Sequence, residues 1–310
     1  MDVLQLRYLL AIAETGSISR AAASLRVAQP SLTQRMNQLE RELGVRLLDR
    51  RPTGARLTPA GSSFVRDAHR LVRQFDHLVT SAKEEQEVRG LVSVGLPSGA
   101  ATHLAAPLCA WVRRHWPGVR LELFESMSGY IQELFSTGRM DLALVYGDGP
   151  TPTRGSEPTL YTESLYLLGE PPGGLPDPDR ATVAVLAGVP IVAPGMHSQL
   201  RGLIEGVVRE HDVEPVVIAH VESLGTMVRL AEDGEACALL PLSAATGSGV
   251  VARRLEPETV RHAVIRTASP TSAPEDAVRV VREGITTVTR ELAASGRWPG
   301  IRIQEEHPRA

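Results

Sequence analysis

The chain has 310 residues, of which 43% are hydrophobic, and carries a formal net charge of −3. This length and composition are typical of a globular protein with two or three domains, and they exclude a disordered or fibrous chain. No apolar run is long enough to span a bilayer, and the N-terminus lacks a secretory signal, so we expect a cytoplasmic protein. The two cysteines, Cys109 and Cys237, stand apart among apolar neighbours, which indicates buried thiols rather than a disulfide or a metal site.

The charge is distributed unevenly along the chain. Residues 1–60 contain nine arginines and five acidic residues, whereas residues 90–310 contain 19 arginines and 26 acidic residues. A small basic segment is therefore followed by a large acidic one. This distribution predicts that only the N-terminal segment contacts a polyanion such as nucleic acid.

Three short helices are predicted in the N-terminal segment. Apolar residues at helical spacing predict a first helix over residues 2–14, which ends at Gly16. Ser17 can cap a short second helix in ISRAAASL. Pro30 then occupies a first-turn position, where its fixed φ is favourable, so a third helix is expected from about Gln29 to Leu43.

A basic ribbon and a long helix follow. The sequence VRLLDRRPTGARLTPAG predicts two short strands joined by a turn at residues 51–54, and three helices with such a ribbon make a winged helix-turn-helix. Thr58 and Pro59 then start a long helix. Its apolar residues recur at alternating spacings of four and three, at Phe64, Ala68, Leu71, Phe75, Leu78 and Ala82. This seam favours pairing of two copies of the helix; the alternative is a stripe that packs on the chain's own body.

The remainder of the chain alternates strands and helices, which predicts a parallel α/β sheet. Strands are expected at 91–96, 119–124 and 141–145 with helices at 101–115 and 128–137, and again at 189–193, 216–221 and 236–240 with helices at 199–211 and 224–232. Residues 260–267 should return to the first lobe, a helix over 274–294 should close it, and the tail after Gly296 should be loosely ordered. We therefore predict three domains: residues 1–58, a linker helix at 59–89, and residues 90–310, with lobe I at about 90–158 and 266–295 and lobe II at about 159–265.

The third helix has an unusual polar face. At 100° per residue, Met36, Leu39 and Leu43 fall within about 40° of Leu32 and form its core face. The opposite side and its flanks carry Pro30, Ser31, Thr33, Gln34, Arg35, Asn37, Gln38 and Arg41. Amide and hydroxyl groups both donate to and accept from base edges, which favours insertion into a major groove while Arg50, Arg51 and Arg56 hold the DNA backbone. The alternative is a solvated face in a purely structural bundle.

No catalytic motif is found. In GLPSG at residues 95–99 the serine comes one place too late for a nucleophile elbow, and neither a phosphate-binding loop nor a dinucleotide-binding motif follows a strand. Nine histidines are scattered without pairs at metal-ligand spacing. We therefore expect no enzyme, no catalytic residues, no metal and no cofactor.

Several motifs occur in the order and at the spacing of a known family. The segment from LRYLLAIAETG to ARLTPAG, with QPSLTQ and LERELGVRLLDR inside it, resembles the DNA-binding domain of LysR-type transcriptional regulators. GLVSVGLPSG, FSTGRMDLALVYG and ESLGTMVRLAEDGEACALLP are similar to that family's effector-binding domain. The resemblance implies a two-lobed α/β domain like that of periplasmic binding proteins. It also implies that the protein binds double-stranded promoter DNA, binds a small-molecule effector between the lobes, and forms a homodimer or homotetramer. RNA polymerase is a candidate partner, and no association with a membrane is implied.

The resemblance also assigns roles to residues of the third helix. It implies that Gln29, Pro30, Ser31, Thr33 and Gln34 approach bases and that Arg50 and Arg51 contact phosphates. Many family members have arginine where this chain has Gln34, and glutamine where it has Arg35. Two consequences are open: Gln34 prefers adenine, or Arg35 takes a phosphate.

Effector-binding residues are expected where strand ends face the crevice between the lobes. These are Pro97, Ser98, Gly99, Ser126, Ser128, His197, Glu222 and Ser223, with Arg201 available to a carboxylate. Ordinary helix capping is the alternative for the serines. We hypothesise that the effector changes the angle between the lobes and thereby the spacing of paired heads on DNA. The competing hypotheses are a regulator that needs no effector, and a small-molecule binding protein or enzyme with an accessory DNA-binding domain.

Overall fold

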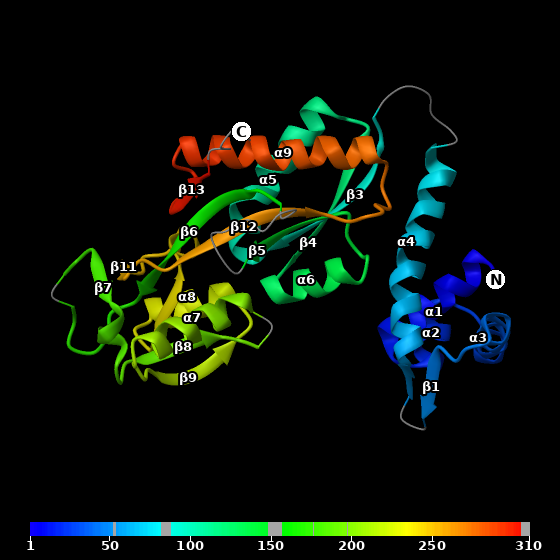
Figure 1. Cartoon of the computed structure of the whole chain (residues 1–310), viewed down its shortest axis with the longest axis horizontal. Coiled ribbons are helices and arrows are strands. Elements are labelled where there is room, and N and C mark those ends of the chain that lie inside the picture. The colour runs from blue at the N-terminus through cyan, green and yellow to red at the C-terminus, as the bar shows by residue number, and fades with distance from the viewer. Residues whose placement is uncertain (52–53, 82–87, 148–156, 176, 197, 305–310) are drawn as a thin grey trace.

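The computed structural model describes residues 1–51, 54–81, 88–147, 157–175, 177–196 and 198–304; within these ranges the side chains of residues 50, 51 and 77–81 are not described. Figure 1 shows a small helical head at the N-terminus, the long helix α4 leading away from it, and a body in which helices cover a twisted sheet. No helix in the described ranges is both long and apolar enough to cross a membrane.

The head contains the three predicted helices. They are α1 (Val3–Thr15), α2 (Ile18–Ser24) and α3 (Gln29–Leu43). Ser17 caps α2 as predicted, by accepting a hydrogen bond from the Arg20 amide, and Gly16 and Gly44 end α1 and α3 in left-handed conformations. One cap was not predicted: the side chains and amides of Asp2 and Gln5 bond reciprocally at the start of α1.

The core face of α3 is the predicted one. Leu32, Met36 and Leu39 are at most 1% exposed and pack with Leu9 and Ile12 of α1. Burial of each such side chain contributes on the order of 1.5–3 kcal/mol. The packing fixes the rotation of α3 about its own axis, so it also determines which side chains of α3 face solvent.

The ribbon and the long helix begin where predicted. Strands β1 (Leu48–Arg51) and β2 (Gly54–Leu57) pair antiparallel. Helix α4 (Pro59–Ser81) is capped by Thr58, whose Oγ1 accepts a hydrogen bond from the Gly61 amide at 3.0 Å. A Cβ at Gly61 would lie 2.1 Å from the carbonyl oxygen of Leu47, so only glycine lets α4 start this close to the ribbon.

The body alternates strands and helices. Its first part comprises β3 (Gly90–Pro97), α5 (Ser98–His115), β4 (Val119–Ser126), α6 (Ser128–Ser136), β5 (Leu142–Gly147) and β6 (Thr159–Leu168). Then follow β7 (Arg180–Thr182), η1 (Val183–Leu186), β8 (Pro190–Pro194), α7 (Gln199–Glu210), β9 (Val216–Val221), α8 (Leu224–Glu232) and β10 (Cys237–Pro241). The last elements are η2 (Leu242–Ala245), β11 (Ala252–Glu256), β12 (Val260–Thr267), α9 (Glu275–Ala294) and β13 (Ile301–Ile303).

The strands share hydrogen bonds in the order β4-β3-β5-β12-β6-β10-β8-β9. Strands β3, β4 and β5 are parallel, as are β8, β9 and β10. Strand β12 pairs antiparallel with β5, which confirms the predicted return of the chain to the first set of strands. Apolar cores result: one contains Leu104, Leu144 and Ile285, another contains Ile191 and Leu239, and a smaller one contains Ile131 and Val145.

The structure differs from the sequence-based predictions at three places. The long strand β6, which pairs with β12, β10, β11 and β13, was not predicted, because it is buried along most of its length and shows no alternation. The expectation of a loose tail is wrong for residues 297–303, since Trp298 is 2% exposed and contacts the rings of His103 and Tyr161, after which β13 pairs with β6. The prediction of buried thiols is wrong for Cys109, which lies on the outer face of α5 and is exposed.

A buried carboxylate links helix α4 to the body. Asp141, just before β5, is 0% exposed and accepts hydrogen bonds from the amides of Ser93, Ser272 and Ala273 at 2.7–3.1 Å. The guanidinium of Arg73 on α4 reaches the same carboxylate and forms an ion pair with it. One side chain of α4 is thus tied to three segments of the body.

The same helix carries a histidine whose pKa is lowered. Burial lowers the pKa of His69 from 6.5 to about 4, and the nearby charges of Arg139 and Arg73 add to this effect. The folded protein therefore binds this proton more weakly than the unfolded chain does. The stability contributed by neutral His69 is fully present above pH 6.5 and is lost as the pH falls from 6.5 towards 4.

We expect a His69→Gln variant to lose less stability than the wild type between pH 7 and about pH 4.5. The difference should be about 1–2 kcal/mol, after allowance for the solvent that reaches this half-buried ring. Urea unfolding at several pH values measures it. Equal pH dependence of the two proteins would contradict the assignment, and His115→Gln, at the exposed end of α5, is the control.

Candidate nucleic-acid interface

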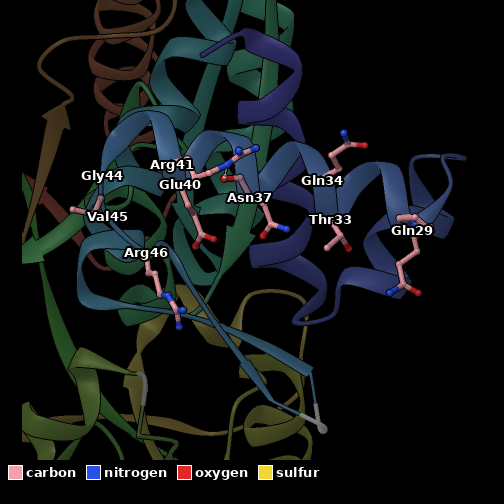
Figure 2. Close-up of a pocket in the computed structure, with 10 residues that line it drawn as sticks. Gln29, Thr33, Gln34, Asn37, Glu40, Arg41, Gly44, Val45 and Arg46 are labelled. Atoms are coloured by element: carbon pink, nitrogen blue, oxygen red, sulfur yellow. Dashed lines mark hydrogen bonds between the residues drawn. The ribbon is translucent and has the colours of Figure 1, made fainter.

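A groove of about 900 Å³ runs along the outer side of α3. It is lined by Gln29, Pro30, Thr33, Gln34, Asn37, Glu40, Arg41, Gly44, Val45 and Arg46. Figure 2 shows these residues in a row along α3, from Gln29 at one end to Val45 at the other, with Arg46 beside the helix. The groove therefore extends over the full length of α3 and the turn that follows it.

The middle of the groove is neutral and polar. Gln29, Thr33 and Asn37 are spaced four residues apart and share one side of α3, next to the core face. Gln34 is exposed and forms no hydrogen bond with any residue in the described ranges. These amide and hydroxyl groups can both donate to and accept from base edges in a major groove.

The structure divides the polar face that the sequence predicted. Ser31, Arg35 and Gln38 do not line the groove. The guanidinium of Arg35 pairs with Asp2, just before α1, at 3.1 Å, and the Gln38 amide donates to Glu42 of α3 at 3.1 Å, so both side chains already have partners within the chain. Of the two consequences left open for Gln34 and Arg35, this geometry favours base contact by Gln34.

The predicted backbone contacts lie on the ribbon. Arg56 on β2 is exposed and stands opposite Asp49 in the strand register. Arg50 and Arg51 belong to β1, but their side chains lie outside the described part of the structure.

At the far end of the groove, Glu40, Gly44, Val45 and Arg46 were not predicted as part of the interface, and Arg41 was predicted only as a member of the polar face of α3. Glu40, Arg41, Gly44, Val45 and Arg46 line the same groove because Gly44, at φ 70°, turns the chain back beside α3. The glycine that ends α3 in the sequence was the available signal for this reversal.

The seam of α4 divides between two environments. Ala68 is 1% exposed and Phe64 half-buried, and both pack on the head of the same chain. Leu71 and Phe75 are 48% and 43% exposed, although they follow on the same face of the helix. Leu78 and Ala82 lie outside the described side chains. The apolar surface available for pairing thus starts at Leu71.

The predicted effector residues are distributed over two cavities. Ser98, Ser126, Glu222 and Ser223 line a cavity of about 400 Å³ that also contains Glu125. Ser223 caps α8 by accepting from the Thr226 amide at 3.3 Å, and Ser128 accepts from the Gln199 amide at 3.2 Å. Pro97 and Gly99 flank Ser98 at the start of α5, and His197 lies outside the described residues.

Arg201 lines the second cavity, which measures about 790 Å³. This cavity lies between the start of α7 and the adjacent ends of β5 and β12, and Tyr146, Arg261 and His262, which line it, were not predicted. Arg261 is buried: its guanidinium lies 2.6 Å from Glu163 and 3.7 Å from the centre of the Tyr146 ring. Burial opposes its charge, but Glu163 raises the pKa of Arg261, and burial lowers the pKa of His262.

Comparisons with known proteins agree across the whole chain. A family model described as "Bacterial regulatory helix-turn-helix protein, lysR family" matches residues 3–62, and one described as "LysR substrate binding domain" matches residues 85–290. The nitrogen assimilation regulatory protein nac of Klebsiella aerogenes is 30% identical over 249 residues, which cover 79% of this chain and 80% of that protein.

Solved structures share the fold at low identity. A full-length OxyR variant from Pseudomonas aeruginosa has a TM-score of 0.65 at 20% identity, with 100% of this chain and 99% of that chain covered. Full-length CbnR in complex with its target DNA has a TM-score of 0.62 at 22% identity, with 94% and 99% covered.

Proposed function

The chain belongs to the LysR family of DNA-binding transcriptional regulators, and on that premise we propose how its parts divide the work. Residues 1–58 bind promoter DNA, residues 59–89 pair two subunits, and residues 90–310 bind the effector, with lobe I at about 90–158 and 266–295 and lobe II at about 159–265. Members of this family are regulators and not enzymes, and we place this one in the cytoplasm, where promoter DNA is found.

The observation that carries the DNA part of the proposal is the groove along α3, whose middle is neutral and polar. We propose that Gln29, Pro30, Thr33, Gln34 and Asn37 enter the major groove. The arginines of the ribbon hold the backbone on one side, and Arg56 is the described member of that set. Phosphate contacts supply affinity for any sequence, whereas the amides and hydroxyls supply the choice of sequence.

Pairing of subunits rests on the exposed part of the α4 seam. Leu71 and Phe75 together present an apolar surface that a second α4 would cover in a homodimer, and two such dimers make the homotetramer. We include RNA polymerase as a partner because a regulator bound at a promoter lies beside the polymerase.

The larger cavity is the better place for an effector with a negative charge. Arg201 and Arg261 both line it, Arg201 paired with Glu205, which also lines the cavity, and Arg261 paired with Glu163 behind it. An anionic effector would therefore compete with Glu205 for Arg201, and Ser198, 6% exposed, stands at the N-terminus of α7. The smaller cavity contains Glu125 and Glu222, and no lysine or arginine is among its described lining residues. Ser128, whose hydroxyl accepts from the Gln199 amide, joins the two lobes beside the larger cavity.

Two measurements test the function. The protein should shift the mobility of DNA from upstream of its own gene at lower concentration than a random duplex of equal length, and equal affinity for both would count against sequence-specific regulation. In a thermal-shift screen of organic acids and amino acids, a ligand of the folded cavity raises the melting temperature. If a ligand raised the melting temperature of Arg201→Gln as much as that of the wild type, the proposed effector site would be contradicted. The proposal of DNA binding would not be affected by that result.

A further inference from the structure

The end of the groove farthest from Gln29 carries two exposed arginines, Arg41 and Arg46. Neither forms an ion pair with an acidic group in the described ranges. Two other arginines of the head differ: Arg7 pairs with Asp76, and Arg35 pairs with Asp2. The charges of Arg41 and Arg46 are therefore available to a ligand, unlike those of Arg7 and Arg35.

Arg46 is held in place from both sides of the backbone. Glu40 accepts hydrogen bonds from the amides of Leu47 and Leu48 at 2.8 and 2.9 Å, which ties the returning segment to α3. The carbonyl oxygen of Arg46 accepts from Thr58 Oγ1 at 2.7 Å. The next two side chains are 1% and 3% exposed. The backbone that carries this guanidinium is thus ordered before any ligand arrives, which lowers the entropy cost of binding.

Arg41 is oriented by its own helix. Its Nε donates to the carbonyl oxygen of Asn37 at 3.2 Å, one turn earlier, so the guanidinium lies along the groove. The terminal Nη1 and Nη2 atoms make no hydrogen bond within the described ranges. They are the part of the guanidinium that forms two parallel bonds with a phosphate.

The length of α3 places this end at the edge of a major groove. From Gln29 to Arg41 the helix rises by about 18 Å, at roughly 1.5 Å per residue. A major groove is about 12 Å wide. When the first turns of α3 face the bases, its last turn therefore lies near the phosphates that border the groove.

We propose that Arg41 and Arg46 contact DNA phosphates at this end of the groove, and that Glu40 is a positioning residue that holds Arg46 beside α3. This extends the interface beyond the first turns of α3 and the ribbon. Phosphate contacts there set the depth and angle at which α3 enters the DNA, and they carry no base preference of their own.

The test is the salt dependence of binding to a random-sequence duplex, measured by fluorescence anisotropy with the full chain between about 50 and 200 mM salt. Arg41→Gln and Arg46→Gln should each lower the slope of log Kd against log salt by about 0.9 for every subunit on the DNA. Arg290→Gln, an equal change of charge at an exposed position of α9, should leave the slope unchanged. Melting temperatures close to that of the wild type show that the variants are folded.

Arg46→Lys should recover part of the slope, because it keeps a point charge. Glu40→Ala should lower the slope as Arg46→Gln does, and combining these two changes should lower the slope no further. When Glu40→Ala is combined with Arg41→Gln, the two decreases in slope should add. Unchanged slopes in both arginine variants would overturn the proposal. So would a loss confined to one DNA sequence, which indicates base contact. If the wild type itself fails to bind the duplex, the DNA-binding function fails instead.

Discussion

Asp141→Ala is expected to lower the free energy of unfolding by about 3–5 kcal/mol, the cost of leaving buried donors and the partly buried guanidinium of Arg73 without their partner. The carboxylate is fully buried and accepts from three backbone amides and the Ser93 hydroxyl, besides its ion pair with Arg73. Alanine supplies none of these acceptors. Urea or thermal unfolding of the full chain measures the change.

The matched control is Asp276→Ala on α9, whose carboxylate is 71% exposed and paired with Arg279. A change within about 0.5 kcal/mol is expected there. Asp141→Asn keeps the shape but replaces an acceptor with a donor that faces other donors, so it should also destabilise the protein. A loss below about 1 kcal/mol in Asp141→Ala would show that the surrounding amides find water instead.

Gln34→Ala is expected to reduce affinity for the preferred DNA site by about 1–3 kcal/mol, which is the discrimination that one bidentate base contact provides. The loss of affinity should concern one base-pair position. The Gln34 amide is exposed at the groove and makes no hydrogen bond within the described part of the chain, so it is available to a single base. The preferred site is first selected from a random library of duplexes. Each position is then substituted, and Kd is measured for both proteins.

Two comparisons decide the result. The salt slope should stay the same, because glutamine neutralises no phosphate. Gln38→Ala, outside the groove and bonded to Glu42, should change affinity by less than about threefold. If Gln34→Ala weakened binding equally on every sequence, its role would be structural and the assignment of base contact would be wrong.

Local signals explain why most of the fold was predictable. The proline at the start of α3, the serine before α2 and the glycines after α1 and α3 each act on the adjacent turn of the chain, and each occupies the expected position. The apolar spacing of α3 likewise identified Leu32, Met36 and Leu39 as its buried face.

Features that depend on distant residues were not predictable. Strand β6 is buried along most of its length and so shows no alternation, and all the strands that pair with it come later in the chain. The tail is ordered by the rings of His103 and Tyr161 around Trp298. In the interface, the pairing of Arg35 with Asp2 joins residues 33 positions apart, so the sequence alone left its role open.

The ion pair between Arg73 and Asp141 couples rotation of the body to displacement of the start of α4. From Arg73 back to Pro59 the helix measures about 21 Å, at roughly 1.5 Å per residue. Because Asp141 is bonded to two other segments of the body, β3 and residues 272–273, the body cannot turn without carrying this point of α4 with it. A turn of about 10°, modest for movements between domains, would displace the start of α4 by about 4 Å. That displacement is about the rise of one base pair, roughly 3.4 Å, so a small turn of the body would move the head by one step along the DNA.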